Sequence, residues 1–156
     1  MKHELLVLDE DKDYARQRIA ELESEITALG PEFYSAFNET SETWHDNAPF
    51  EAVRDKQTLL STELQNLKYI LRSSLPSIPK QKKGMVGIGS KVKIVNVKTK
   101  KVTTYIIAGD WTSRAGHLVD GLTIISRKSP LATTLIGKKA GQEFVFKDKY
   151  TIESIE

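Results

Sequence analysis

The side chains with the greatest potential for chemistry gather in one polar stretch, residues 38–47. The stretch contains three carboxylates, a tryptophan and a histidine, namely Glu39, Glu42, Asp46, Trp44 and His45. Such groups can move protons or hold metals, but in an exposed turn they more often only face the solvent. Elsewhere the sequence contains no phosphate-binding loop, nucleophile elbow or metal-binding histidine pair. The sequence therefore indicates no catalytic centre of the protein's own.

Composition excludes several further classes of site. The chain has no cysteine, so it has no disulfide framework, thiolate zinc site or cysteine nucleophile. No window reaches the roughly 18 apolar residues that cross a bilayer, and the short apolar run at residues 5–8 lacks a signal-peptide cleavage site. We therefore expect a cytoplasmic protein without membrane contact.

Charge is divided unevenly along the chain, although the formal net charge is only +2. Residues 1–75 carry a formal charge of −7 and residues 76–156 carry +9. This segregation suggests two units with different partners.

The polar stretch lies between two segments that are predicted to be helices, each with a stripe of apolar residues along one face. Apolar residues alternate at spacings of three and four, the pattern of a helix with one buried face. The first stripe comprises Ala15, Ile19, Leu22, Ile26, Leu29 and Phe33. The second comprises Phe50, Val53, Leu60, Leu64, Leu67 and Leu71. Because neither helix can bury its stripe alone, the pattern predicts an antiparallel coiled-coil hairpin over residues 1–75, with an acidic tip near residues 38–47.

Local signals refine the hairpin. Asp46 or Asn47 can cap the returning helix, and Pro49 suits its first turn. Gly30 and Pro31 should kink or interrupt the first helix, because proline lacks an amide proton and clashes with the preceding turn.

The second half has the pattern of a small sheet. Residues 76–84 predict a linker, since they are rich in proline and lysine without an apolar period. The β-branched and aromatic residues that follow predict strands, and a serine, proline and glycine frame one short helix at residues 129–137. The expected strands are 91–97, 101–108, 122–126, 143–147 and 150–155. The fold class is thus α+β, with an antiparallel twisted sheet and one short helix in a domain of residues 85–156.

Three segments resemble the GreA/GreB family of bacterial transcription factors. The longest is residues 129–141, which read SPLATTLIGKKAG and resemble the family's C-terminal signature. Residues 47–54, NAPFEAVR, are similar to the start of the family's returning helix. The third match begins at residues 86–92, VGIGSKV, which resemble the family's entry into its C-terminal domain. It continues into a strand pair that ends at residues 104–109, TYIIAG.

The resemblance implies an FK506-binding-protein-like C-terminal domain that docks at the secondary channel of RNA polymerase while the coiled coil reaches the active site. Such a factor is not an enzyme itself, and it contacts nascent RNA only indirectly. In cleavage-competent relatives two tip acids help hold a polymerase magnesium ion, so that the polymerase cuts backtracked RNA. Hard oxygen ligands suit magnesium. We expect a monomer with no cofactor bound alone.

The tip departs from the family pattern, which has an aspartate followed three residues later by a glutamate and an asparagine. Alignment on Asn47 places Asp46 at the glutamate but Thr43 at the aspartate, while Glu42 is adjacent. We therefore predict Glu42 and Asp46 as the magnesium contacts in the complex, with cleavage stimulation and a non-cleaving or inhibitory role both open.

The docking residues predicted by the resemblance are Lys128, Ser129, Pro130 and Leu131. Lys128 stands where the family commonly carries an acidic or neutral polar residue. Two other functions stay open. A prolyl isomerase would follow from the FK506-binding-protein-like fold alone. A nucleic-acid-binding module would use the lysine-rich hairpin of residues 91–101, although lysines there also protect a sheet edge.

Overall fold

The computed structural model describes residues 5–42 and 48–156, and it describes only the backbone of residues 36–42 and 48. Contacts divide the chain into a helical unit, Lys12–Arg72, and a sheet unit, Met1–Asp11 with Ser73–Glu156. The sequence-based boundary assigned residues 1–75 to the coiled coil, whereas residues 5–11 group with the sheet unit. Within the described ranges no helix is long and apolar enough to span a bilayer.

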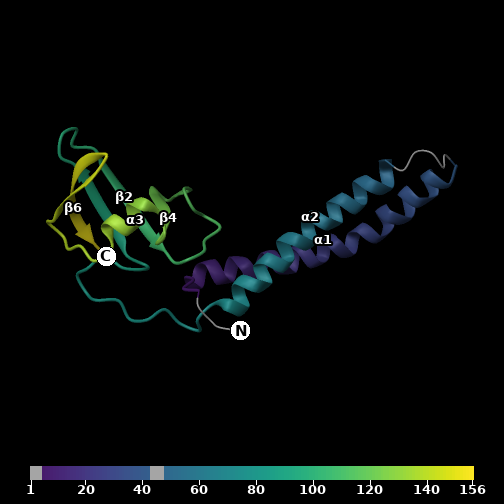
Figure 1. The fold of residues 1–156 in the computed structure, drawn as a ribbon, viewed down its shortest axis with the longest axis horizontal. Coiled ribbons are helices and arrows are strands. Elements are labelled where there is room, and N and C mark those ends of the chain that lie inside the picture. Colours follow the sequence, from purple (N-terminus) through teal and green to yellow (C-terminus); the bar gives the residue numbers. More distant parts are fainter. Residues whose placement is uncertain (1–4, 43–47) are drawn as a thin grey trace. The chain divides into compact units, whose positions relative to one another are not determined.

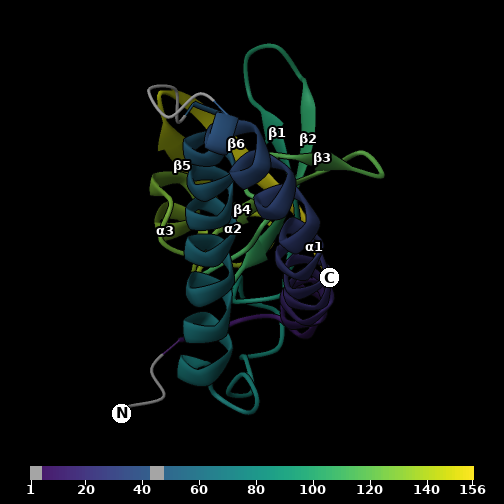
Figure 2. The same cartoon turned by 90° about the vertical axis from the view of Figure 1, so that its right-hand side faces the viewer.

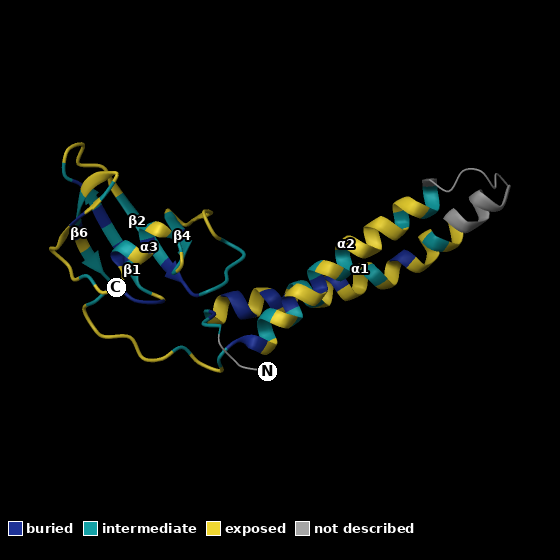
Figure 3. Cartoon of the chain, viewed as in Figure 1, coloured by how far each residue is buried: buried dark blue, intermediate teal, exposed yellow. Residues whose placement is uncertain are grey.

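Helices α1 (Asp9–Glu42) and α2 (Ala48–Ser73) form the hairpin that the apolar spacing predicts. In α1 the predicted stripe is buried or half-buried, and exposed residues separate its members (Figure 3). Leu22 and Leu29 are almost fully buried in α1, and Leu64 and Leu67 are buried in α2. The two stripes therefore provide the apolar faces that an isolated helix would leave exposed to water.

The two helices run in opposite directions, side by side in both views (Figures 1 and 2). Arg18, in the first third of α1, places Nη2 2.9 Å from Oε2 of Glu63, in the second half of α2. At the other end, the rings of Phe33 and Phe50 meet edge to face with centroids 5.6 Å apart. These pairs fix an antiparallel register.

Helix α1 continues through Pro31, so the predicted interruption at Gly30 and Pro31 is wrong. Both residues are exposed. The carbonyl group that Pro31 leaves without an amide partner belongs to Thr27, which is exposed as well. This carbonyl can therefore bond to water, which lowers the cost of keeping the helix continuous.

The sheet unit contains six strands in the order β3-β4-β2-β1-β6-β5. Their bounds are β1 Lys91–Asn96, β2 Val102–Ala108, β3 Leu118–Val119, β4 Leu122–Ser126, β5 Glu143–Phe146 and β6 Asp148–Ile155. The predicted hairpins β1-β2 and β5-β6 are both antiparallel. Residues 76–84 form no helix or strand and are largely exposed.

The fold class is confirmed as α+β, but the sheet is mixed rather than wholly antiparallel. Strand β4 pairs in parallel with β2, with Ile106 opposite Ile124. Residues 109–121 link the two strands, a connection long enough to return the chain to the same end of the sheet. Strand β3 lies within this crossover and was not predicted, because its two residues are too few to show a period.

Helix α3 (Pro130–Leu135) packs on the sheet and completes its core. Ala132 and Leu135 are fully buried against Val92, Ile107 and Ile152. The short helix is therefore anchored on the sheet by its buried side chains. The loop that precedes it is held at both ends, by β4 and by α3.

Residues 5–11, here called the N-terminal strap, cross the sheet unit. The Leu5 amide donates to the carbonyl of Ser73 at 2.9 Å, and the Asp110 amide donates to the carbonyl of Leu6. Val7 is 1% exposed. A Cβ atom at Gly109 would overlap the Leu6 carbonyl oxygen, so only glycine permits this close approach.

Candidate functional site

The tip predicted from the sequence lies largely outside the described residues. Glu42 is the last residue of α1 and its side chain is not described, while Thr43, Asp46 and Asn47 lie between the helices outside the described ranges. The carboxylate constellation and the capping role of Asn47 therefore stay predictions. Within the described ranges, no three histidine or acidic side chains gather as a metal site would require.

The predicted docking residues lie together where β4 passes into α3, in a segment here called the Ser129 loop (residues 126–131), which includes the last residue of β4 and the first two residues of α3. Ser129 caps α3, because its Oγ accepts a hydrogen bond from the Ala132 amide at 3.3 Å. Pro130 occupies the first helical position and is exposed, and Leu131 is half-buried against the core. The predicted serine, proline and glycine signals of this helix are confirmed, with Gly137 at a φ of 89° just beyond its end.

The backbone of the Ser129 loop is fixed by its own hydrogen bonds. The Arg127 amide donates to the carbonyl of Ala108 at 3.0 Å. Ser126 Oγ donates to the Gly109 carbonyl at 3.1 Å and accepts from the Lys128 amide at 3.2 Å. These hydrogen bonds restrain the backbone of the loop.

A buried carboxylate lies directly beneath this loop. Asp110 has a side chain that is only 2% exposed, and its Oδ1 accepts from Arg127 Nε at 2.6 Å. Its Oδ2 accepts from the Leu6 amide at 2.7 Å. Lys128 Nζ lies 3.6 Å from Oδ1. Asp110 thus joins the strap, the end of β2 and the Ser129 loop.

Sequence patterns did not predict this junction. Leu6 and Asp110 are 104 positions apart, and Arg127 is 17 positions from Asp110. No helical or strand period connects residues at such separations. The one available signal is the TYIIAG segment, which ends at the residue before Asp110.

The environment of Asp110 favours its charged form. Burial alone would raise the pKa of this carboxyl, but the hydrogen bonds from Leu6 and Arg127 and the charges of Arg127 and Lys128 outweigh burial. The pKa of Asp110 is therefore below its ordinary value. The group is ionised at neutral pH and strongly bonded.

In a second buried carboxylate, Asp11, the effect of burial on the pKa exceeds the effect of the hydrogen bonds and charges around it. Its Oδ1 accepts from Thr112 Oγ1 at 2.8 Å and from Arg114 Nε at 3.2 Å. Its Oδ2 is buried and has no hydrogen-bond partner in the described part of the chain. Burial raises the pKa of Asp11, and the bonds to Thr112 and Arg114 only partly oppose this rise.

The lysine-rich hairpin is partly neutralised by one acid of the neighbouring strand β6 and one acid directly after that strand. Lys91 Nζ lies 3.7 Å from Glu156 Oε2, and Lys93 Nζ lies 3.8 Å from Glu153 Oε2. These pairs lower the positive charge that this surface presents to nucleic acid.

Four aromatic side chains of the sheet unit pack in its core or against it. Phe144 is buried and stacks on Tyr150 with centroids 5.5 Å apart. Tyr105, Phe146 and Tyr150 pack against the same core. The aromatic lining that a prolyl isomerase would need is therefore not supported by these residues.

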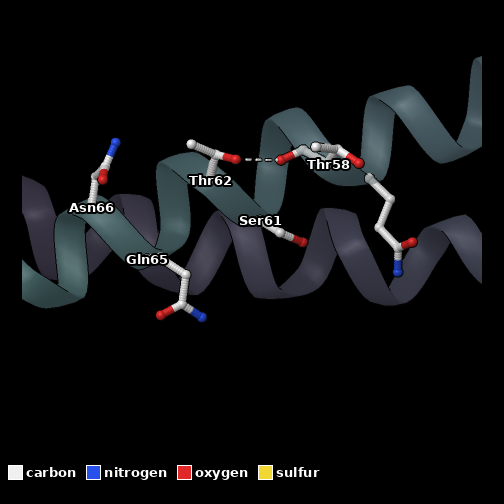
Figure 4. A pocket seen from close by; sticks show the side chains of 6 residues that line it. Thr58, Ser61, Thr62, Gln65 and Asn66 are labelled. Carbon is white, nitrogen blue, oxygen red and sulfur yellow. Dashed lines mark hydrogen bonds between the residues drawn. The ribbon is translucent and has the colours of Figure 1, made fainter.

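An open groove of about 370 Å³ follows the exposed face of α2 (Figure 4). Its lining is uncharged and polar, and Thr62 Oγ1 donates to the Thr58 carbonyl at 2.8 Å. The other lining residues are Gln57, Ser61, Gln65 and Asn66. With no titratable side chain among these residues, the groove offers no acid or base for catalysis.

Comparison with known proteins finds a family match in the sheet unit. Residues 80–156 match the family described as "Transcription elongation factor, GreA/GreB, C-term". Transcription elongation factor GreA of Nitrosococcus oceani is 30% identical over 133 residues, which cover 83% of this chain and 81% of that protein. The GreA of Mycoplasmopsis pulmonis is 33% identical over 108 residues, covering 68% of this chain and 65% of that relative.

Solved structures resemble the chain more distantly. GreA factor homolog 1 of Thermus thermophilus is 16% identical with a TM-score of 0.40, covering 98% of this chain and 99% of that one. A GreA/GreB factor from Nitrosomonas europaea is 14% identical with a TM-score of 0.40, covering 59% of this chain and 78% of that one. Because both scores are below 0.5, the assignment depends on the sequence matches.

Proposed function

The chain belongs to the GreA/GreB family of transcription elongation factors, and from this premise we propose that it binds bacterial RNA polymerase and modulates transcription at the polymerase active site. The Ser129 loop docks on the rim of the secondary channel. The helical hairpin of α1 and α2 carries the acidic tip into the channel. The protein acts in the cytoplasm as a monomer and has no catalytic centre of its own.

The observation that carries this proposal is the Ser129 loop. Its predicted contact residues are grouped, exposed or half-buried, and held by hydrogen bonds on a rigid base. A surface with little conformational freedom loses little entropy on binding, which favours affinity. The proposed function also requires an arm that can enter the channel. The antiparallel hairpin of α1 and α2 provides such an arm, with the link between the two helices as its tip.

Two outcomes at the active site are open. Glu42 and Asp46 would provide two carboxylates toward the magnesium ion of the polymerase and so promote cleavage of backtracked RNA. Thr43 at the family's aspartate position favours the alternative, a regulator that occupies the channel without stimulating cleavage.

The test uses stalled, backtracked elongation complexes of the cognate polymerase. Wild type, Glu42→Ala and Asp46→Ala are incubated with the complexes, and short 3′ RNA fragments are measured. Loss of fragments in either variant, with binding retained, would assign cleavage to the tip. Binding by the wild type without fragments would assign the non-cleaving role.

A matched control is Asp55→Ala, which removes an exposed carboxylate of α2 about 10 Å along the helix from its first residue. This variant should behave as the wild type. A wild type that does not bind the polymerase would contradict the proposed function altogether.

A further inference from the structure

The Ser129 loop carries two cationic side chains, whose charge indicates the charge of the partner surface that this loop would bind. Arg127 and Lys128 carry side chains that are 35% and 65% exposed. Among the side chains that the structure describes, the carboxylate paired with them is Asp110, which is 2% exposed. The three charges sum to +1, and the part that faces outward is positive.

The charge of Asp110 is directed inward. Its two oxygens bind Arg127 and the Leu6 amide at 2.6 and 2.7 Å, which are short hydrogen bonds. A carboxylate that is buried and already bonded cannot form an ion pair with an incoming protein. The charge that remains outward at this point is the Lys128 ammonium group, on a side chain that is 65% exposed.

Lys128 is the member of this group that can change partners. Its Nζ lies 3.6 Å from Asp110, beyond ordinary hydrogen-bond length, and most of its side chain is in solvent. Exposed pairs of this kind contribute little to stability, so the ammonium group can turn to an external anion at small cost. Its backbone, in contrast, is held by Ser126.

We propose that the Ser129 loop recognises an acidic patch on RNA polymerase, and that Lys128 determines this preference. The inference depends on the proposed function and specifies the chemistry of the partner surface. Charge complementarity of this type steers encounter and selects between partners more than it adds affinity. A polymerase whose rim presents basic residues at this point would be disfavoured, because like charges oppose each other across the interface.

The test measures binding to core RNA polymerase of the same organism, free of DNA and RNA, for wild type, Lys128→Gln and Lys128→Glu. Removing one exposed ion pair should weaken binding about twofold to fivefold. Reversing the charge should weaken it roughly tenfold, because attraction is replaced by repulsion. The wild-type affinity should also fall more steeply with added salt than that of Lys128→Gln.

Lys98→Glu is the matched control for a general effect of net charge. Lys98 is exposed in the β1-β2 turn, close to the first residue of β2. Ala108, which the Ser129 loop contacts, is the last residue of β2, roughly 20 Å away along the strand. This variant should bind as the wild type does. Thermal unfolding of each variant establishes that the fold is retained.

The inference is overturned if Lys128→Glu binds as tightly as the wild type, or if Lys98→Glu loses as much affinity as Lys128→Glu. It is also overturned if the loss appears only when nucleic acid is present, which would assign the cation to a nucleic-acid contact. In these three cases the wild type still binds and the proposed function stands. A wild type that does not bind core polymerase refutes both.

Discussion

Replacing the buried carboxylate Asp110 by asparagine tests the junction that supports the Ser129 loop. Asparagine preserves the shape of the side chain but has one oxygen and one amide group in place of two oxygens. The Leu6 amide and Arg127 Nε bind different oxygens of Asp110. The variant can therefore accept only one of these hydrogen bonds, and it turns a donor toward the other donor.

The expected cost follows from the surroundings of the two donors. A hydrogen bond to a charged group contributes about 1.5 to 3 kcal/mol when buried. Arg127 is 35% exposed, so solvent compensates part of its loss. We expect Asp110→Asn to lower the free energy of unfolding of the sheet unit by about 2 kcal/mol.

Urea unfolding followed by tryptophan fluorescence measures this change. Trp111 is adjacent to Asp110, and a Trp44→Phe background removes the other tryptophan of the chain. The unfolding midpoint should fall by roughly 1 M urea. Asp148→Asn, which alters an exposed carboxylate of the same unit, is the control and should leave the midpoint unchanged.

The pH dependence gives an independent check, because the pKa of Asp110 is lowered in the folded state. Its stabilising contribution is then complete above the unfolded pKa of about 4 and is lost as the pH falls through the lower folded value. The difference between wild type and Asp110→Asn should shrink in that acidic range. Equal midpoints at neutral pH would refute the assigned role of Asp110.

Three further predictions concern the same unit. Ser129→Ala removes the cap of α3 and should cost about 1 kcal/mol in urea unfolding. In Gly109→Ala the new Cβ overlaps the Leu6 carbonyl oxygen, so the Asp110 amide should exchange its hydrogen at least about tenfold faster. Asp11→Asn removes a poorly compensated buried charge and should raise stability by about 1 kcal/mol at neutral pH. Because burial raises the pKa of Asp11, that gain should diminish as the pH falls through the raised value.

The helical unit was predictable because its information is local. The spacing of apolar residues such as Leu22 and Leu64 specifies which face is buried, and a short link leaves the antiparallel arrangement as the simplest way to bury both faces. The same reasoning failed at Pro31, where exposure to solvent makes the missing hydrogen bond less costly.

The sheet was predictable strand by strand but not in its pairing. β-branched runs identify β1, β2 and β4, yet nothing in a strand specifies whether its neighbour is parallel. The direction of β4 depends on the crossover of residues 109–121, which has a weak pattern. The Ser129 cap was predictable because its signals are adjacent, while the Asp110 junction depends on contacts across most of the chain.

The N-terminal strap has a consequence for the order in which the molecule is assembled. The ribosome makes Leu6 first, but the carboxylate that receives its amide follows 104 residues later. At 5–20 residues per second, this interval is roughly 5 to 20 s of synthesis. Residues 5–11 must therefore wait with their apolar side chains unburied, and they take their place only after the end of β2 has emerged.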